Sequence, residues 1–116
     1  MTVKRIVANI ESSDPAEALR FYRDILGLEL VMDHGWIRTL AGEAGARAQI
    51  SFATEGGSGT PVPDLSIEVD DVDAVHDAMR EAGFAITYAI VDEPWGVRRF
   101  FVRDPFGRLV NILAHS

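Results

Sequence analysis

The sequence predicts an α+β fold built from two copies of a βαβββ module. The first observation is a repeat, because strand, Asp, helix, Gly and strand follow one another in both halves of the chain. Asp14 and Asp71, which begin the two helices, are 57 residues apart, and Gly27 and Gly83, which end them, are 56 apart. Both spacings are close to half of the 116 residues, which is typical of an internally duplicated domain.

The length of the chain and its Gly- and Pro-rich stretch predict the boundaries of the domain and its modules. A chain of 116 residues has the common size of one domain, so residues 1–116 are expected to form a single domain. The stretch EGGSGTPVPD is rich in Gly and Pro, as loops between regular elements are. We therefore expect module one at about residues 1–54, a linker at about 55–63 and module two at about 64–116.

Each predicted helix has its own start and stop signals. Asp14 is expected to cap the first helix and Asp70 or Asp71 the second, because an Asp side chain accepts hydrogen bonds from the first helical N–H groups. A glycine after each apolar stripe supplies the left-handed residue that ends a helix. The apolar positions at helical spacing are Ala18, Leu19, Tyr22, Ile25 and Leu26 in the first helix and Val72, Val75, Met79 and Ala82 in the second.

Four predicted strands alternate between apolar and polar side chains. The polar positions are Asn9 and Glu11, Gln49 and Ser51, Asp64, Ser66 and Glu68, and Asn111. One face of such a sheet packs on the helices, and the other is either exposed to solvent or turned into a semi-polar trough. The recurrence of the pattern on four strands, including the first and last of the chain, favours the trough.

Composition excludes several classes of function. The formal net charge of −7 argues against nucleic acid as a partner, because phosphate binding depends on clustered Lys and Arg. There is no cysteine, which excludes disulfides and thiolate zinc sites. No apolar run is long enough to span a membrane and no signal peptide is visible, so a cytoplasmic protein is expected. The acidic surface either serves solubility or favours a cationic small molecule as ligand.

Three stretches resemble a known family. ALRFYRDILGLEL, IEVDDVDAVHDAMREAG and EPWGVRRFFVRDPFGRLVNIL occur in this order and together cover much of the chain. They resemble the glyoxalase/bleomycin resistance/dioxygenase group, also called the vicinal oxygen chelate superfamily. The resemblance implies two βαβββ modules that form a curved mixed sheet around a shared cavity. It also implies a homodimer, since members of this length usually pair.

The resemblance also identifies positions where metal-dependent members carry their ligands. These positions fall on Val7, Ser51, Asp64 and Asn111, where metal-binding members show His, Glu or Gln. Val has no donor atom, Ser and Asn are weak neutral ligands, and only Asp64 is a strong one. We therefore expect no metal and no other cofactor. Asn111 is expected to be a hydrogen-bonding wall of the cavity, since an amide donates and accepts.

The residues expected to bind a ligand are Asn9, Glu11, Trp36, Trp95 and Asn111. Trp95 lies in EPWG, a loop that covers the ligand in similar antibiotic-binding members, although a Trp there also suits packing against the sheet edge. The weak candidates for acid–base catalysis are Glu11, Asp64 and Glu68, whose alternative role is to pair with Arg5 and Arg47. His34, His76 and His115 are scattered and are expected to be ordinary surface or half-buried residues.

Three hypotheses about function follow. The first is a metal-independent binding protein of the bleomycin-resistance-like type, holding a small, antibiotic-like molecule in a dimer cavity. The alternative is an enzyme of the same superfamily, a lyase, isomerase or dioxygenase, with an atypical or metal-free acid–base site. The third is a structural or regulatory dimer whose trough is filled by its own side chains.

Overall fold

The computed structural model describes residues 2–42 and 48–116, and Arg47, one expected partner of the carboxylates, lies outside them. The chain divides into two compact units. One unit is Val7–Val62, and the other combines Met1–Ile6 with Pro63–Ser116. Among the described residues no helix is long and apolar enough to cross a membrane.

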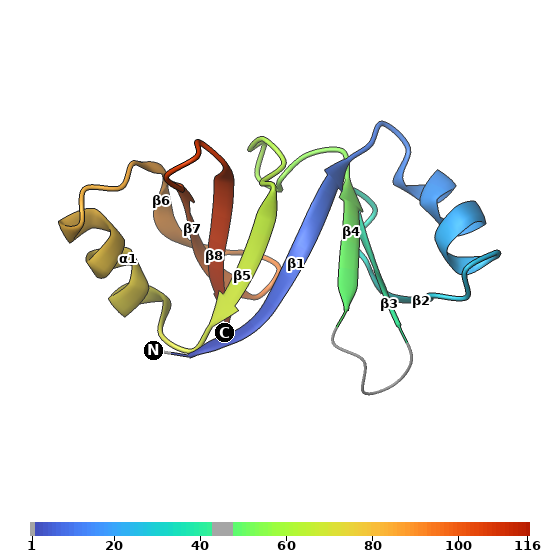
Figure 1. The fold of residues 1–116 in the computed structure, drawn as a ribbon, viewed down its shortest axis with the longest axis horizontal. Coiled ribbons are helices and arrows are strands. Elements are labelled where there is room, and N and C mark those ends of the chain that lie inside the picture. The colour runs from blue at the N-terminus through green and yellow to red at the C-terminus, as the bar shows by residue number, and fades with distance from the viewer. Residues whose placement is uncertain (1, 43–47) are drawn as a thin grey trace. The chain divides into compact units, whose positions relative to one another are not determined.

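Module one carries four strands and a short, irregular helical segment (Figure 1). Its elements are β1 (Val3–Glu11), η1 (Pro15–Glu17), η2 (Leu19–Arg23), β2 (Glu29–Asp33), β3 (Ile37–Ala41) and β4 (Gln49–Ala53). The strands lie in the order β2-β3-β4-β1, with β1 parallel to β4 and the other neighbours antiparallel.

Module two has the same arrangement with a regular helix. Its elements are β5 (Leu65–Val69), α1 (Val72–Glu81), β6 (Ile86–Glu93), β7 (Val97–Arg103) and β8 (Leu109–His115). The strands lie in the order β5-β8-β7-β6, and β5 runs parallel to β8. The predicted α+β fold of two βαβββ modules is therefore confirmed.

The core of module two lies between α1 and one face of its sheet. The buried cluster comprises Val69, Val72, Val75, Phe100, Val102, Val110 and Ile112. Asp71 caps α1 as predicted, since its Oδ1 accepts a hydrogen bond from the Ala74 N–H at 3.1 Å, and Gly83 ends the helix with φ of +87°. His76 packs edge-on against Phe100 with ring centroids 5.0 Å apart, so the helix contributes an aromatic contact as well as its apolar stripe.

The first helix differs from its prediction. Asp14 makes no side-chain cap; its backbone carbonyl instead accepts the Glu17 N–H at 3.1 Å, which closes a 3-10 turn. A single π-helical turn follows, from which Tyr22 reaches Phe52 with ring centroids 4.9 Å apart. Ile25 and Leu26, predicted for the buried stripe, are 78% and 58% exposed because the irregular turns rotate them away from the sheet.

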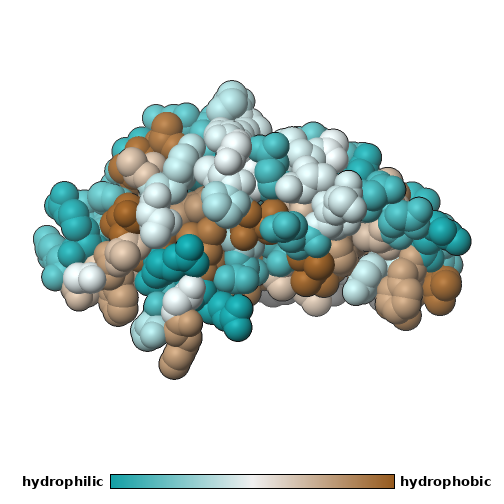
Figure 2. Space-filling view, turned by 90° about the horizontal axis from the view of Figure 1, so that it is seen from above, coloured by the Kyte–Doolittle hydropathy of each residue, from teal (hydrophilic) through white to brown (hydrophobic). Residues whose placement is uncertain are grey.

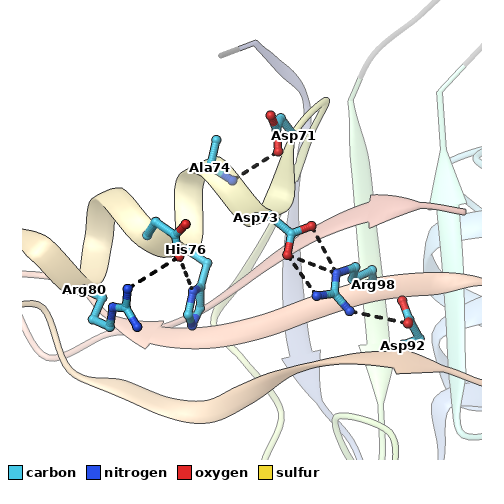
Figure 3. Close-up of polar contacts among 8 residues, drawn as sticks. Asp71, Asp73, Ala74, His76, Arg80, Asp92 and Arg98 are labelled. Atoms are coloured by element: carbon cyan, nitrogen blue, oxygen red, sulfur yellow. Dashed lines mark hydrogen bonds and ion pairs between the residues drawn. The ribbon is translucent and has the colours of Figure 1, made fainter.

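The first turn of α1 is tied to the β6–β7 hairpin by ion pairs (Figure 3). Arg98 donates from Nη2 to Asp73 Oδ1 at 2.8 Å and lies 3.4 Å from Asp92 Oδ2. The hydrogen bond from Arg98 holds the pKa of Asp73 below its ordinary value of 3.8. The same contact raises the pKa of Arg98.

Asp73→Asn is expected to remove a pH-dependent part of the stability. A carboxyl whose pKa is lowered in the folded state stabilises that state above its unfolded pKa, and the contribution is lost as pH falls below about 3.8. The difference in urea midpoint between wild type and variant should therefore be constant above about pH 5 and shrink in acid. A difference that does not change with pH would contradict this role of the carboxylate.

The predicted linker forms a compact, hydrogen-bonded turn. The Gly56 N–H donates to the Thr60 carbonyl at 2.8 Å, and the Thr60 N–H donates to the Gly57 carbonyl at 3.0 Å. Gly57, Ser58 and Gly59 all have positive φ, and the Gly59 N–H donates to Glu55 Oε1 at 2.9 Å. The glycines therefore serve a specific backbone conformation, since left-handed φ favours residues without Cβ.

Candidate functional site

One row of side chains crosses the sheet of module two on the face opposite α1. Ser66 in β5 is paired with Asn111 in β8, Asn111 with Phe101 in β7, and Phe101 with Tyr88 in β6. Residues directly opposite one another on neighbouring strands point to the same face of the sheet. The amide, a hydroxyl and two aromatic rings therefore share one surface.

Asn111 has one amide end paired and the other unpaired. Nδ2 donates to Ser66 Oγ at 3.1 Å, whereas Oδ1 is buried and has no hydrogen-bond partner among residues 2–42 and 48–116. If the amide were turned round, Ser66 would donate to the oxygen and the nitrogen would become the unpaired end, since a hydroxyl both donates and accepts. Asn111 is only 7% exposed, and an unsatisfied buried polar group costs about 1–3 kcal/mol.

A buried ion pair adjoins this row. Arg99 Nε donates to Glu93 Oε2 at 2.7 Å, and the Tyr88 hydroxyl donates to the same oxygen at 3.1 Å. The Arg99 guanidinium lies over the rings of Tyr88, Trp95 and Phe101, at 5.3, 4.9 and 4.8 Å from their centroids. These three rings thus contact a cation of the protein itself. They include Trp95, which was expected to bind a ligand.

The Arg98-Arg99 pair points to opposite faces, as strand alternation predicts. Arg98 reaches Asp73 and Asp92 on the α1 side, while Arg99 is 2% exposed on the other face. The anion that Arg99 contacts is the protein's own Glu93. Sequence reasoning missed Glu93, which ends β6, begins the EPWG turn and is paired with Val97 of β7.

Glu68 is shared between two basic side chains. Its Oε1 lies 3.2 Å from Arg5 Nε, and its Oε2 lies 3.0 Å from His115 Nδ1. The pairing with Arg5 was one of the two readings left open by the sequence. His115 lies at the surface as expected, since its side chain is 54% exposed, and Glu68 is its carboxylate partner.

Asp64 has a backbone role. Its Oδ2 accepts a hydrogen bond from the Leu109 N–H at 3.0 Å, and its own N–H donates to the Leu109 carbonyl at 2.8 Å. The side chain therefore joins the start of β5 to the start of β8. Asp64 is the one strong donor among the family's metal positions and a candidate for acid–base catalysis. In the structure it helps to hold the parallel strands β5 and β8 in register.

In module one, Ser51, one of the family's metal-ligand positions, forms a hydroxyl pair with Thr39. Ser51 Oγ and Thr39 Oγ1 are 2.7 Å apart and both residues are buried. Asn9 is the Cα partner of Ser51, just as Ser66 is the partner of Asn111. Asn9 and Ser66 are also 57 residues apart, the spacing of the internal repeat, and this signal was sufficient to find Ser66.

The other candidate residues of module one, Val7, Glu11 and Trp36, differ in their exposure to solvent. Val7 is buried at 5% exposure, whereas Glu11 is exposed. Trp36 is half-buried, its ring stacks on His34 with centroids 6.3 Å apart, and its carbonyl accepts the Thr54 N–H. Trp36 therefore contacts the turn between β2 and β3 and the residue that follows β4.

The four positions that the family uses for metal do not form a ligand set here. Val7 has no donor, Ser51 is bonded to Thr39, and Asp64 accepts from a backbone N–H. Within the described part of the chain, no three His, Asp or Glu side chains are grouped so as to hold an ion. The chemistry of these donors does not fit a first-row metal, which in proteins prefers imidazole, thiolate or carboxylate.

The comparisons identify the family of the chain. The Glyoxalase/Bleomycin resistance protein/Dioxygenase superfamily model matches residues 5–112. The chain belongs to this superfamily, as its resemblance implied. The comparison with curated proteins found no match.

Solved structures agree on the fold. A NAD-dependent benzaldehyde dehydrogenase from Legionella pneumophila is 15% identical with a TM-score of 0.76, covering 96% of this chain and 99% of that one. A methylmalonyl-CoA epimerase from Mycobacterium tuberculosis is 23% identical with a TM-score of 0.72, covering 98% and 89%. A superfamily member from Vibrio splendidus 12B01 is 19% identical with a TM-score of 0.64, covering 97% and 99%. Identities this low show a common fold and leave the reaction of this chain open.

Proposed function

We propose that this chain binds a small molecule without a metal, through the Ser66–Asn111 pair of module two. The observation that carries the proposal is the unpaired, buried end of the Asn111 amide. Buried polar atoms in folded proteins nearly always have a hydrogen-bond partner. An unpaired atom on this polar face therefore suits a ligand that forms the missing hydrogen bond. The poor fit of the donor set to a metal supports binding without an ion.

The chemistry of the pair restricts the ligand. In the amide orientation of the structure, Oδ1 is the unpaired end of Asn111 and accepts, so a matching ligand presents an N–H or O–H group at that point. A cationic nitrogen is favoured because the net charge of the protein is −7. Tyr88 is half-buried in the same row, one strand beyond Phe101, and offers an aromatic surface on the face that carries the polar pair. We therefore expect a small, antibiotic-like cation with an aromatic part.

Asn111→Leu is expected to weaken ligand binding about 10- to 100-fold while the unliganded protein stays folded. The substitution removes the acceptor and keeps a similar volume, and a hydrogen bond to a charged group contributes about 1.5–3 kcal/mol. Calorimetric titration of cationic aromatic antibiotics, tested one at a time against both proteins, measures the change. The matched control is Thr39→Val, which removes a buried polar atom from module one and should leave the affinity unchanged. Equal affinity of wild type and Asn111→Leu for every ligand that binds would contradict the proposed site.

The metal-independent part of the proposal has its own measurement. Untagged protein from metal-supplemented culture should contain no stoichiometric metal. Its melting temperature should not rise on adding nickel, zinc, manganese or iron(II), because a ligand that binds only the native state stabilises it by mass action. Stoichiometric metal would overturn this part, and oxygenase and lyase assays would follow.

We also propose that the protein is a homodimer, with module one contributing to the interface. Phe21, Ile25 and Leu26 in and after η2, and Val31 in β2, are each more than half exposed. Figure 2 shows hydrophobic groups at the surface at its right-hand end, where Figure 1 places the helical segment of module one. Contiguous exposed apolar side chains typically mark contact surfaces. Sedimentation velocity distinguishes a dimer from a monomer.

A further inference from the structure

We propose that His115 is a general base that removes a proton from a bound substrate, and that Glu68 is its positioning residue. The substrate class is a small molecule with a weakly acidic C–H bond next to an electron-withdrawing group. This is a catalytic activity beyond ligand binding. It rests on the contact between Glu68 and His115, which is independent of the unpaired amide of Asn111.

The hydrogen bond between the two side chains fixes the tautomer of the imidazole. Glu68 Oε2 lies 3.0 Å from His115 Nδ1, and an ionised carboxylate only accepts hydrogen bonds. The proton of neutral His115 is therefore on Nδ1, and the lone pair is on Nε2. An imidazole oriented in this way by a carboxylate is the arrangement that general bases require.

The contacts around Glu68 hold it in place for this role. Its second oxygen lies 3.2 Å from Arg5 Nε, and its side chain is 17% exposed, against 33% for Arg5. In the ion pairs of residues 2–42 and 48–116, His115 meets Glu68 directly and Arg5 through Glu68. A carboxylate held at both oxygens has little freedom to turn away from the imidazole.

The position of His115 is also fixed on the backbone side. His115 is paired with Val97 of β7, and the next residue, Ser116, donates its N–H to the Gly96 carbonyl at 2.9 Å. The side chain is 54% exposed, so a substrate has access to Nε2.

The dyad and the Ser66–Asn111 pair share one face of the sheet. His115 follows Asn111 by four residues on β8 and Glu68 follows Ser66 by two on β5, and alternate residues of a strand point to the same side. At about 3.3 Å per residue, His115 lies roughly 13 Å along the strand from Asn111. One end of that face thus carries the hydrogen-bonding pair and the other the base.

A test reaction for such a base needs no cofactor. In 5-nitrobenzisoxazole, Nε2 takes the proton from carbon 3, the C–H electron pair forms the third bond of a nitrile, and the N–O bond breaks. The leaving oxygen becomes a nitrophenolate, which absorbs visible light, and His115 leaves the step as imidazolium. Proton transfer to solvent then restores the base.

The experiment compares wild type, His115→Gln, Glu68→Gln and the matched control His34→Gln, an exposed histidine of module one. A positioned general base contributes about 100- to 10,000-fold, so wild type should exceed free imidazole at equal concentration by at least about 100-fold. His115→Gln should lose that excess, Glu68→Gln should lose about tenfold, and His34→Gln should keep the full rate. A wild-type rate equal to that of free imidazole, or an unchanged rate in His115→Gln, would overturn the proposal.

A spectroscopic measurement separates positioning from a structural role of Glu68. The nitrogen chemical shifts of His115 in neutral solution should report a proton on Nδ1 in wild type and a mixture of tautomers in Glu68→Gln. The rate should also follow the fraction of neutral His115 measured in the same samples. The same tautomer mixture in both proteins, or a rate that ignores the His115 titration, would contradict the assignment.

Discussion

Glu93→Ala is expected to lower the free energy of unfolding by about 3–5 kcal/mol. The carboxylate is the partner of Arg99 Nε at 2.7 Å, and the side chains of Arg99 and Glu93 are 3% and 4% exposed. Removing Glu93 takes away the carboxylate that the Arg99 guanidinium contacts, in a site with little access to water. Urea unfolding followed by fluorescence of Trp95, which contacts Arg99, measures the loss.

The matched control is Asp92→Ala, one residue earlier in β6. Asp92 lies 3.4 Å from Arg98 and its side chain is 74% exposed, so its removal should cost less than about 1 kcal/mol. The double variant Glu93→Leu with Arg99→Met should recover much of the stability, because a buried ion pair is commonly replaceable by apolar side chains of similar volume. Equal costs for Glu93→Ala and Asp92→Ala would show that the buried pair has no special importance.

Gly56→Ala is expected to destabilise the protein by about 3 kcal/mol, at the upper end of the cost of overpacking. A Cβ on Gly56 would lie 2.1 Å from the Pro61 carbonyl oxygen and 2.3 Å from Thr60 Oγ1. The first of these atoms is backbone, so the whole turn has to move to admit a methyl group. Thermal unfolding of the variant measures the effect.

Gly59→Ala in the same turn is the control. Gly59 has φ of +74°, but a Cβ there would meet nothing within 4 Å. Its substitution should therefore cost only the strain of left-handed backbone, about 1–2 kcal/mol. Equal stability of the two alanine variants would contradict this prediction. It would show that the turn rearranges at little cost in free energy to admit a methyl group at Gly56.

The sequence predicted those parts of the fold that depend on local signals. Asp71 caps α1 and Gly83 ends it, as the residue types and their spacing indicate. The repeat of 57 residues predicted the βαβββ order of both modules, and the alternation of side chains along the last strand placed Asn111 on the polar face. The first helix failed because the Asp14 backbone carbonyl, rather than its carboxylate, accepts the Glu17 N–H, and sequence does not decide between the two.

The candidate site was predicted in part, because its contacts depend on register between strands. Glu93 and Arg99 meet diagonally across the β6–β7 hairpin, where Val91 pairs with Arg99 and Glu93 pairs with Val97, so their contact depends on which residues form the turn. The contact between Glu68 and His115 requires β5 and β8 to be parallel neighbours in one register, although 47 residues separate the two side chains. Asp64 looked like a ligand from its residue type, and only the structure shows that the Leu109 N–H engages it.

The turn at residues 55–62 also decides where this protein can be engineered. Circular permutation and inserted sequences succeed at loop tips whose backbone makes few contacts. The stretch between the modules looks suitable by composition, yet Gly56 and Thr60 bond to each other across it and Gly56 has no space for a side chain. A reporter peptide or new chain ends placed there would disrupt a packed element, so new termini belong elsewhere on the surface.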